Sequence, residues 1–140
     1  MADRVRKVNY CYTKVPNYAG RGEEALRALR EAGVNLLAYS AFPSAGRKAQ
    51  MDFIPEDMSA FNKVARKNGW RMSKVKKGFL ITGQERLGAV HRHIAKLSDA
   101  NINITAADAL SAGKGRYGMI LWVKPKQYAR AARVLGAKMA

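Results

Sequence analysis

One pattern in the sequence occurs twice at a fixed spacing. The pattern consists of a turn, a segment with helical periodicity and a strand that begins near an Asn. Its second copy lies 68 positions after the first, so that Gly20 matches Gly88 and Asn35 matches Asn103. Repeats of this kind mark units that fold alike. We therefore expect the 140 residues to form two half-size domains, residues 1–76 and 77–140. Units this small bury thin cores, so the two are expected to share an interface.

Hydrophobic periodicity predicts the order β-α-β-β-α-β for the first copy. Alternation through Val8, Tyr10 and Tyr12 is typical of a strand with one buried face, and the apolar stripe that ends before Gly33 indicates a helix. Asp57 is a suitable N-cap for the second helix. The predicted strands are 5–15, 35–42, 49–54 and 70–76.

The second copy follows the same order but is shorter at its end. Leu87, Val90, Ile94 and Leu97 have the spacing of one helix face, and Pro125 is suited to the first turn of a last helix. Its predicted strands are 79–82, 102–110 and 117–123. The fold class expected is α+β, with two ferredoxin-like units in tandem, antiparallel sheets with helices on one face, and a second unit that lacks a full last strand.

Composition limits the functions open to the chain. Lys and Arg number 26 against 10 Asp and Glu, a net charge of +16 that attracts nucleic acid, anionic membrane surface or anionic small molecules without specifying which. Cys11 is the single cysteine, which excludes a disulfide framework and a cysteine metal cluster. No apolar run approaches the length of a membrane span, and the N-terminus lacks the apolar stretch of a signal peptide, so we expect a cytoplasmic protein.

No constellation of residues indicates catalysis. His91 and His93 are two positions apart on a predicted helix and point in different directions, so they cannot share a metal. Asp99 and Asp108 have no partner at catalytic spacing, and Cys11 alternates into a strand as a small buried residue. We expect a protein that is not an enzyme and uses no metal or cofactor.

With the turn glycines and the Asn residues that follow the first helix of each copy, residues 7–136 resemble tandem ACT domains. The second copy carries the closer match, in the segments 85–90, 101–104 and 115–123. The resemblance implies a regulatory module that binds a small ligand, most commonly an amino acid, where the turn of one unit meets the second strand of its neighbour. The implied ligand-binding residues are Asn17, Tyr18, Ala19, Gly20, Asn35 and Leu36 in the first copy, and Glu85, Arg86, Leu87, Gly88, Asn103 and Ile104 in the second.

The chemistry of these residues suits an amino acid. Unpaired amides at a helix start bind a carboxylate, glycine permits close approach, and an Asn side chain both accepts and donates hydrogen bonds. The copies also depart from the family pattern, because Ala19 and Leu87 replace its usual Pro and Glu85 replaces its usual Asn or Asp. Glu85 would repel a carboxylate, so we expect one site or two unequal sites, with the first copy favoured.

Two other functions remain open from the sequence. Residues 116–122 approach the aromatic strand motif of RNA-recognition domains, but Met119 stands at an aromatic position and Tyr117 and Trp122 differ in parity. The alternatives are an RNA- or DNA-binding module and a structural adaptor without a ligand. The residues expected to contact any polyanion are Lys63, Arg66, Lys67, Arg71, Lys74, Lys76 and Lys77. Open sheet edges predict a homodimer as well, and no membrane contact is expected.

Overall fold

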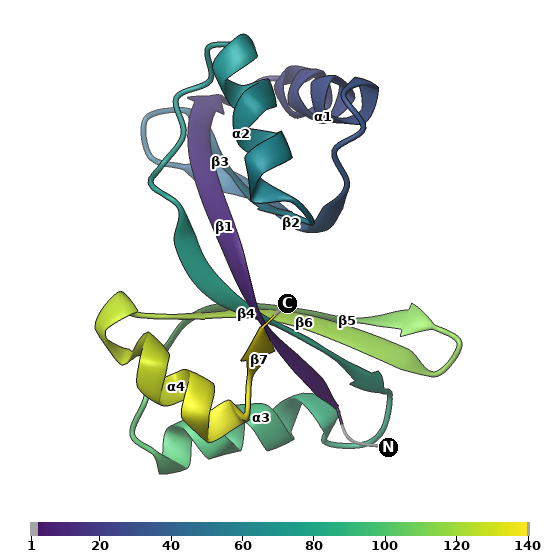
Figure 1. Ribbon diagram of the computed structural model, residues 1–140, viewed down its shortest axis with the longest axis vertical. Coiled ribbons are helices and arrows are strands. Elements are labelled where there is room, and N and C mark those ends of the chain that lie inside the picture. The colour runs from purple at the N-terminus through teal and green to yellow at the C-terminus, as the bar shows by residue number, and fades with distance from the viewer. Residues whose placement is uncertain (1–2, 140) are drawn as a thin grey trace. The chain divides into compact units, whose positions relative to one another are not determined.

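The computed structural model describes residues 3–139, which form two compact units (Figure 1). We name residues 9–76 the central unit, and residues 3–8 together with 77–139 the terminal unit. The first strand, β1 (Arg4–Pro16), contributes to both, because its residues up to Val8 group with the terminal unit. The grouping differs from the domains 1–76 and 77–140 in the residues before Asn9; residues 1, 2 and 140 of those domains lie outside the described part.

The central unit has three antiparallel strands in the order β2-β3-β1, with two helices. Phe53 of β3 lies opposite Cys11 of β1 on one side and opposite Tyr39 of β2 on the other. As predicted, Asp57 caps the second helix, since its Oδ1 accepts a hydrogen bond from the Ala60 amide at 3.2 Å. After β1 its elements are α1 (Arg21–Glu31), β2 (Leu36–Ser44), β3 (Lys48–Pro55) and α2 (Met58–Lys67).

Aromatic side chains form the centre of the central unit's core. Phe53 and Phe61 are fully buried, with ring centroids 5.2 Å apart, and Trp70 stacks on Phe53 at 6.5 Å with an interplanar angle of 11°. Leu29 of α1 and Cys11 of β1 belong to the same cluster. Apolar residues three or four positions apart on each helix thus pack against the inward-facing residues of the strands. Both helices lie on the same face of the sheet.

The terminal unit has the strand order β7-β1-β4-β6-β5. Ile81, Met119 and Leu121 of its antiparallel strands β4 and β6 pack against Leu97 and Ala131 of its helices. The mixed architecture of antiparallel strands and helices is the α+β class that the sequence predicts. The elements are β4 (Lys76–Gln84), α3 (Ala89–Asp99), β5 (Ile104–Gly113), β6 (Arg116–Val123), the 3-10 turn η1 (Pro125–Gln127), α4 (Tyr128–Leu135) and β7 (Lys138–Met139).

The first residues of β1 supply what the terminal unit lacks at its end. The unit's own last strand, β7, is two residues long and pairs in parallel with β1, where Arg6 lies opposite Lys138. In the sheet β1 lies beside β4, the first long strand after the central unit, and this is the place that the last strand of a ferredoxin-like unit takes. The predicted shortage of a full last strand is therefore confirmed, and one 13-residue strand serves two units.

The predicted strand over residues 70–76 is wrong. Residues 70–75 are irregular, and β4 begins at Lys76. The segment follows β1 through one backbone hydrogen bond, from the Ser73 amide to the Tyr12 carbonyl at 2.8 Å. The return bond from the Tyr12 amide goes to the Ser73 hydroxyl at 2.9 Å instead of to a carbonyl. A side chain has replaced one rung of the ladder, which is why the pairing does not continue as a strand.

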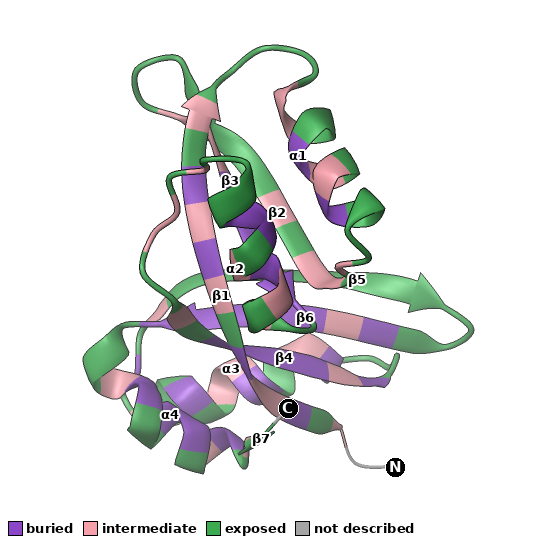
Figure 2. Cartoon of the chain, turned by 45° about the horizontal axis from the view of Figure 1, so that its top comes forward, coloured by how far each residue is buried: buried purple, intermediate pink, exposed green. Residues whose placement is uncertain are grey.

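Exposure differs sharply between the last two long strands of the terminal unit. β5 is the outer strand and is exposed from Thr105 to Gly113, with only Ile104 half-buried, whereas its neighbour β6 is mostly buried (Figure 2). An exposed outer strand leaves backbone groups free to pair. Within residues 3–139, no helix is long and apolar enough to cross a membrane.

Candidate functional site

The first turn joins β1 to α1 and is exposed at all four of its residues, 17–20. Gly20 is the N-cap of α1 with φ +98°, a conformation that glycine adopts without strain, and it offers no side-chain cap. Among the described residues, the amides of Gly22 and Glu23 therefore have no hydrogen-bond acceptor. The Asn17 side chain is also unpaired within residues 3–139, while its amide donates to the Arg47 carbonyl at 2.9 Å.

Charges around the first turn are partly compensated. Glu23 lies 3.7 Å from Arg27, and Glu24 lies 3.9 Å from Arg21. The Arg21 guanidinium also lies 5.8 Å from the centre of the Tyr18 ring, which is 57% exposed. The turn thus presents to solvent an aromatic ring, two backbone amides and an Asn side chain that have no partner among residues 3–139.

The second turn has the same backbone but different side-chain contacts. Gly88 is the N-cap of α3 with φ +79° and no side-chain cap, and Leu87 is fully exposed. Glu85 accepts a hydrogen bond from the Ser111 hydroxyl at 2.9 Å. Arg86 is bound to Asp3, which is part of the same terminal unit. Two of its four predicted ligand residues therefore already have partners.

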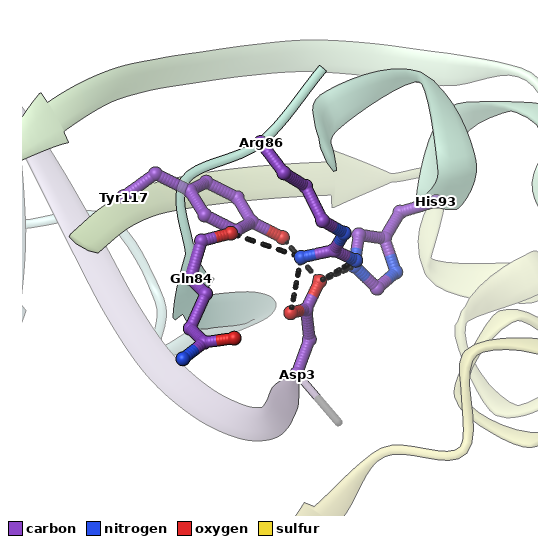
Figure 3. Close-up of polar contacts among 5 residues, drawn as sticks. All are labelled: Asp3, Gln84, Arg86, His93 and Tyr117. Atoms are coloured by element: carbon purple, nitrogen blue, oxygen red, sulfur yellow. Dashed lines mark hydrogen bonds and ion pairs between the residues drawn. The ribbon is translucent and has the colours of Figure 1, made fainter. Parts of the chain in front are cut away.

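Asp3 is the centre of a buried polar network beside the second turn (Figure 3). Arg86 donates to both carboxylate oxygens, from Nη1 at 3.2 Å and from Nη2 at 3.4 Å, and His93 Nε2 lies 2.7 Å from Oδ2. The Tyr117 hydroxyl donates to the same Oδ2. With 2% of its side chain exposed, Asp3 depends on these donors to be ionised.

The network controls the ionisation of its members. Burial alone would raise the pKa of Asp3, but the hydrogen bonds from Tyr117, Arg86 and His93 outweigh it and hold that pKa well below the ordinary value of 3.8. Burial, with the hydrogen bond to Asp3, raises the pKa of Tyr117. A glycine is required alongside, because a Cβ on Gly83 would collide with the Asp3 carboxylate. An internal carboxylate thus holds the arginine of the second turn.

The turn and the Asn-bearing strand start of one unit are not brought together. β1 and β2 both pair antiparallel with β3, so Leu36 begins β2 at the end of the sheet away from the first turn. The 11 residues of α1, about 16 Å of helix, separate Gly20 from Asn35. The same holds between Gly88 and the exposed Asn103, which precedes half-buried Ile104.

The predicted basic residues are available on the surface of the chain. Only Lys76 among them is half-buried, with its ammonium 5.3 Å from the centre of the Tyr12 ring; the others are exposed. In the described part of the chain none of the seven is in an ion pair. They are Lys63, Arg66, Lys67, Arg71, Lys74, Lys76 and Lys77.

Other motifs have structural roles. Tyr117 is buried and bonded to Asp3, so it is not placed to stack on a nucleic-acid base. Lys114 and Gly115 form a two-residue hairpin turn between β5 and β6, with φ +54° and +69°. Cys11 is buried, and burial, aided by the charge of Asp52, raises its pKa to about 11. No group of residues suited to a metal ion occurs between residues 3 and 139.

The Asp3 network is not among the features expected from the sequence. One signal was present, because His93 lies four positions after Ala89 and four before Leu97, on the buried stripe of α3. A histidine there needs a polar partner. Its partner lies 90 positions away, and no local pattern indicates Asp3.

Comparisons with known proteins bear on the fold. No protein-family model matches the chain, and no curated protein sequence does. The solved structure of protein BT0572 from Bacteroides thetaiotaomicron matches with a TM-score of 0.81 at 16% identity, covering 94% of this chain and 88% of that one. The ligand-free regulatory subunit of aspartate kinase from Thermus thermophilus matches with a TM-score of 0.60 at 15% identity, over 96% and 93%.

A third structure, of aspartokinase alpha and beta subunits, matches with a TM-score of 0.63 at 14% identity, over 96% of this chain and 95% of that one. The chain has an ACT-like fold. At identities this low the likeness concerns the ACT-like fold alone, and it agrees with the architecture that the duplicated turn predicts.

Proposed function

We propose that this chain is a non-enzymatic regulatory protein of the cytoplasm that binds an amino acid at the first turn, in an arrangement of tandem ACT units. The observation that carries the proposal is the open start of α1. Gly20 leaves the amides of Gly22 and Glu23 without acceptors, and the Asn17 side chain beside them has no partner in the described chain. Matches to aspartate kinase regulatory structures support it at the level of fold.

The chemistry of recognition follows from these groups. The ligand carboxylate accepts hydrogen bonds from the free amides, where the helix dipole favours negative charge. The ammonium donates to the Asn17 side-chain carbonyl or to Glu24, whose charge Arg21 only partly offsets at 3.9 Å. The second turn has the same open amides but holds Asp3 on Arg86, so it binds more weakly. The two sites are therefore unequal, as Glu85 already suggests.

A complete site needs a second unit. Since α1 separates the first turn from Asn35 and Leu36, those residues act on a ligand held by a neighbouring unit. We propose that a homodimer supplies this neighbour and that the outer strands pair, because β5 is exposed along nearly its whole length. If the units can adopt two arrangements, the ligand then increases the population of the arrangement that binds it more tightly, by an amount set by the difference in affinity between the two arrangements.

A thermal-shift screen of the twenty common amino acids tests the proposal. A ligand at 100 times its dissociation constant adds roughly 2.7 kcal/mol of stability, which is a clear rise in melting temperature. Asn17→Ala is expected to remove the rise, whereas Asn62→Ala, a matched change on α2, is expected to keep it. If no amino acid raises the melting temperature of the folded chain, the ligand-binding proposal fails, and a stable dimer without a ligand would then favour a structural adaptor.

A second candidate, an RNA- or DNA-binding module, is favoured by the seven basic side chains between residues 63 and 77, which lie outside ion pairs in the described chain. Charge reversal at Lys67, Arg71 and Lys74 tests it by retention of single-stranded RNA in rising salt. Retention that is lost with charge reversal supports this candidate. Retention that survives charge reversal contradicts it.

A further inference from the structure

The central unit holds a cleft of about 660 Å³ on the helix side of its sheet. One wall is the side of α1 that carries Arg21 and Ala28, and the other is the segment after α2, with Trp70 and Arg71. Phe53 of β3 and Thr13, Lys14 and Val15 of β1 also line it. A cleft of this volume is in the range of small-molecule sites. All of its lining belongs to residues 13–71, within one unit.

The sequence explains why space remains between the helices. Ala25 and Ala28 stand on the cleft side of α1, and Gly69 follows α2 with φ +66°, so no large side chain fills the gap. In the wall after α2, the half-buried Trp70 ring stacks on the Phe53 ring, nearly parallel to it, with the ring centroids 6.5 Å apart. Trp70 therefore connects the buried aromatic core to the wall of the cleft and gives that wall one aromatic side chain.

The rim of the cleft is cationic. Lys14, Arg21, Arg27 and Arg71 line it with two acids, Glu24 and Glu31, an excess of two positive charges. Of the four cations, only Arg21 and Arg27 are in ion pairs, exposed contacts of 3.9 and 3.7 Å that contribute little. Lys14 and Arg71 make no ion pair with any residue of the described chain. An anionic group at the rim would have at least two uncommitted cations within the cleft's lining.

We infer that this cleft binds a small organic anion that carries a flat apolar ring. The ring lies against Trp70, and the carboxylate or phosphate pairs with Arg71 and its neighbours at the rim. The cleft shares Arg21 and Glu24 with the surroundings of the first turn, but the Gly22 and Glu23 amides are not in its lining, and the inference does not rest on the regulatory proposal above.

Titrations of the full chain by NMR test the inference with a built-in control. The probes are 1-naphthoate and adenosine monophosphate, with 1-naphthalenemethanol and adenosine as their uncharged counterparts. The indole N–H resonance of Trp70 is expected to shift on adding the anions, with dissociation constants of about 1 mM or lower. That of Trp122, in the terminal unit, is expected to stay unchanged. A response to naphthoate alone, or to the nucleotide alone, distinguishes a carboxylate from a phosphate ligand.

Variants separate a built site from general attraction to the +16 chain. Ala28→Leu fills the cleft and is expected to abolish the shift, with folding checked by circular dichroism. Arg71→Gln keeps the fold's backbone contacts and is expected to weaken binding about tenfold. Arg66→Gln, an exposed arginine of α2 outside the cleft, is expected to have no effect.

Three outcomes overturn the inference. The first is no Trp70 shift with either anion at about 10 mM, a concentration well above a weak site's dissociation constant. The second is equal weakening by Arg66→Gln and Arg71→Gln, which means unspecific charge attraction. The third is binding of the uncharged counterparts as tight as that of the anions.

Discussion

Replacement of Asp3 by Asn tests the physical reading of the terminal unit most sharply. The two side chains have the same shape, but Asn loses the charge and offers one acceptor oxygen in place of two. If that oxygen keeps the hydrogen bonds with Tyr117 and His93, the side-chain NH₂ of the new Asn faces the Arg86 guanidinium. Both groups are hydrogen-bond donors, so they cannot bond to each other. Because the carboxylate is 2% exposed, water cannot compensate. Unpairing of a buried charged network of this kind costs about 2–4 kcal/mol.

The pH dependence of the same variant follows from linkage. The pKa of Asp3 is held well below 3.8 in the folded chain, so unfolding takes up a proton at pH values between the two. The network's contribution to stability is fully present above about pH 5 and is lost as the pH falls toward the folded pKa. The Asn variant lacks this contribution, so its stability is expected to fall less steeply with acid than that of the wild type.

Urea unfolding followed by the two tryptophan indole resonances measures both effects. Trp122 reports the terminal unit and Trp70 the central unit, so the loss is expected at Trp122. Asp99→Asn, an exposed acid on α3, serves as the control and is expected to change stability by less than about 0.5 kcal/mol. An Asp3→Asn change no larger than that of the control, or an unchanged acid dependence, would refute the network as described.

Two further substitutions and one labelling experiment test the packing around Asp3 and the central unit. Gly83→Ala places a Cβ against the Asp3 carboxylate and is expected to destabilise the terminal unit by about 1–3 kcal/mol in the same urea assay; a neutral effect would contradict the packing. Asp57→Ala removes the cap on the Ala60 amide and is expected to cost about 1 kcal/mol in thermal unfolding, whereas an unchanged melting temperature would argue against the cap. Cys11, whose pKa burial raises to about 11, is expected to resist a thiol reagent at pH 8 until urea unfolds the chain, and rapid labelling of the native protein would contradict its burial.

Much of the fold is predictable because its signals are local. The αL glycines at positions 20 and 88 end strands and begin helices, and Asp57 has the side chain of an N-cap in front of an amphipathic stripe. These features depend on residues that are close in sequence, so the same contacts form whatever the rest of the fold is. The hairpin turn at Lys114 and Gly115 was predictable for the same reason.

The sharing of β1 and the Asp3 network are not predictable in this way. The alternation of β1 indicates a strand with one buried face, but it does not show that residues up to Val8 complete a sheet whose other strands begin only at Lys76. Asp3 meets His93 and Tyr117 across 90 and 114 positions. For residues 70–76 the strand pattern was sound, yet the Ser73 hydroxyl took the place of a backbone acceptor.

The candidate ligand residues show the same division. The exposed turn and its glycine follow from local sequence, whereas the partner of Arg86 and the distance from Gly20 to Asn35 depend on topology. The spacing of the repeat does not distinguish the two turns, whereas Glu85 in the second already favours the first. Their side-chain contacts make the first the better candidate, because Asn17 is unpaired in the described chain and Arg86 is not.

An NMR titration of the chain with each common amino acid tests the proposed function most directly. We expect one or a few amino acids to shift the amide resonances of Gly22 and Glu23, which have no acceptor among the described residues, and we expect Asn17→Ala to remove the shift. The corresponding amides of Val90 and His91 in α3 are expected to respond at higher concentrations. No shift at Gly22 and Glu23 with any amino acid at about 10 mM, in a folded chain, would contradict it.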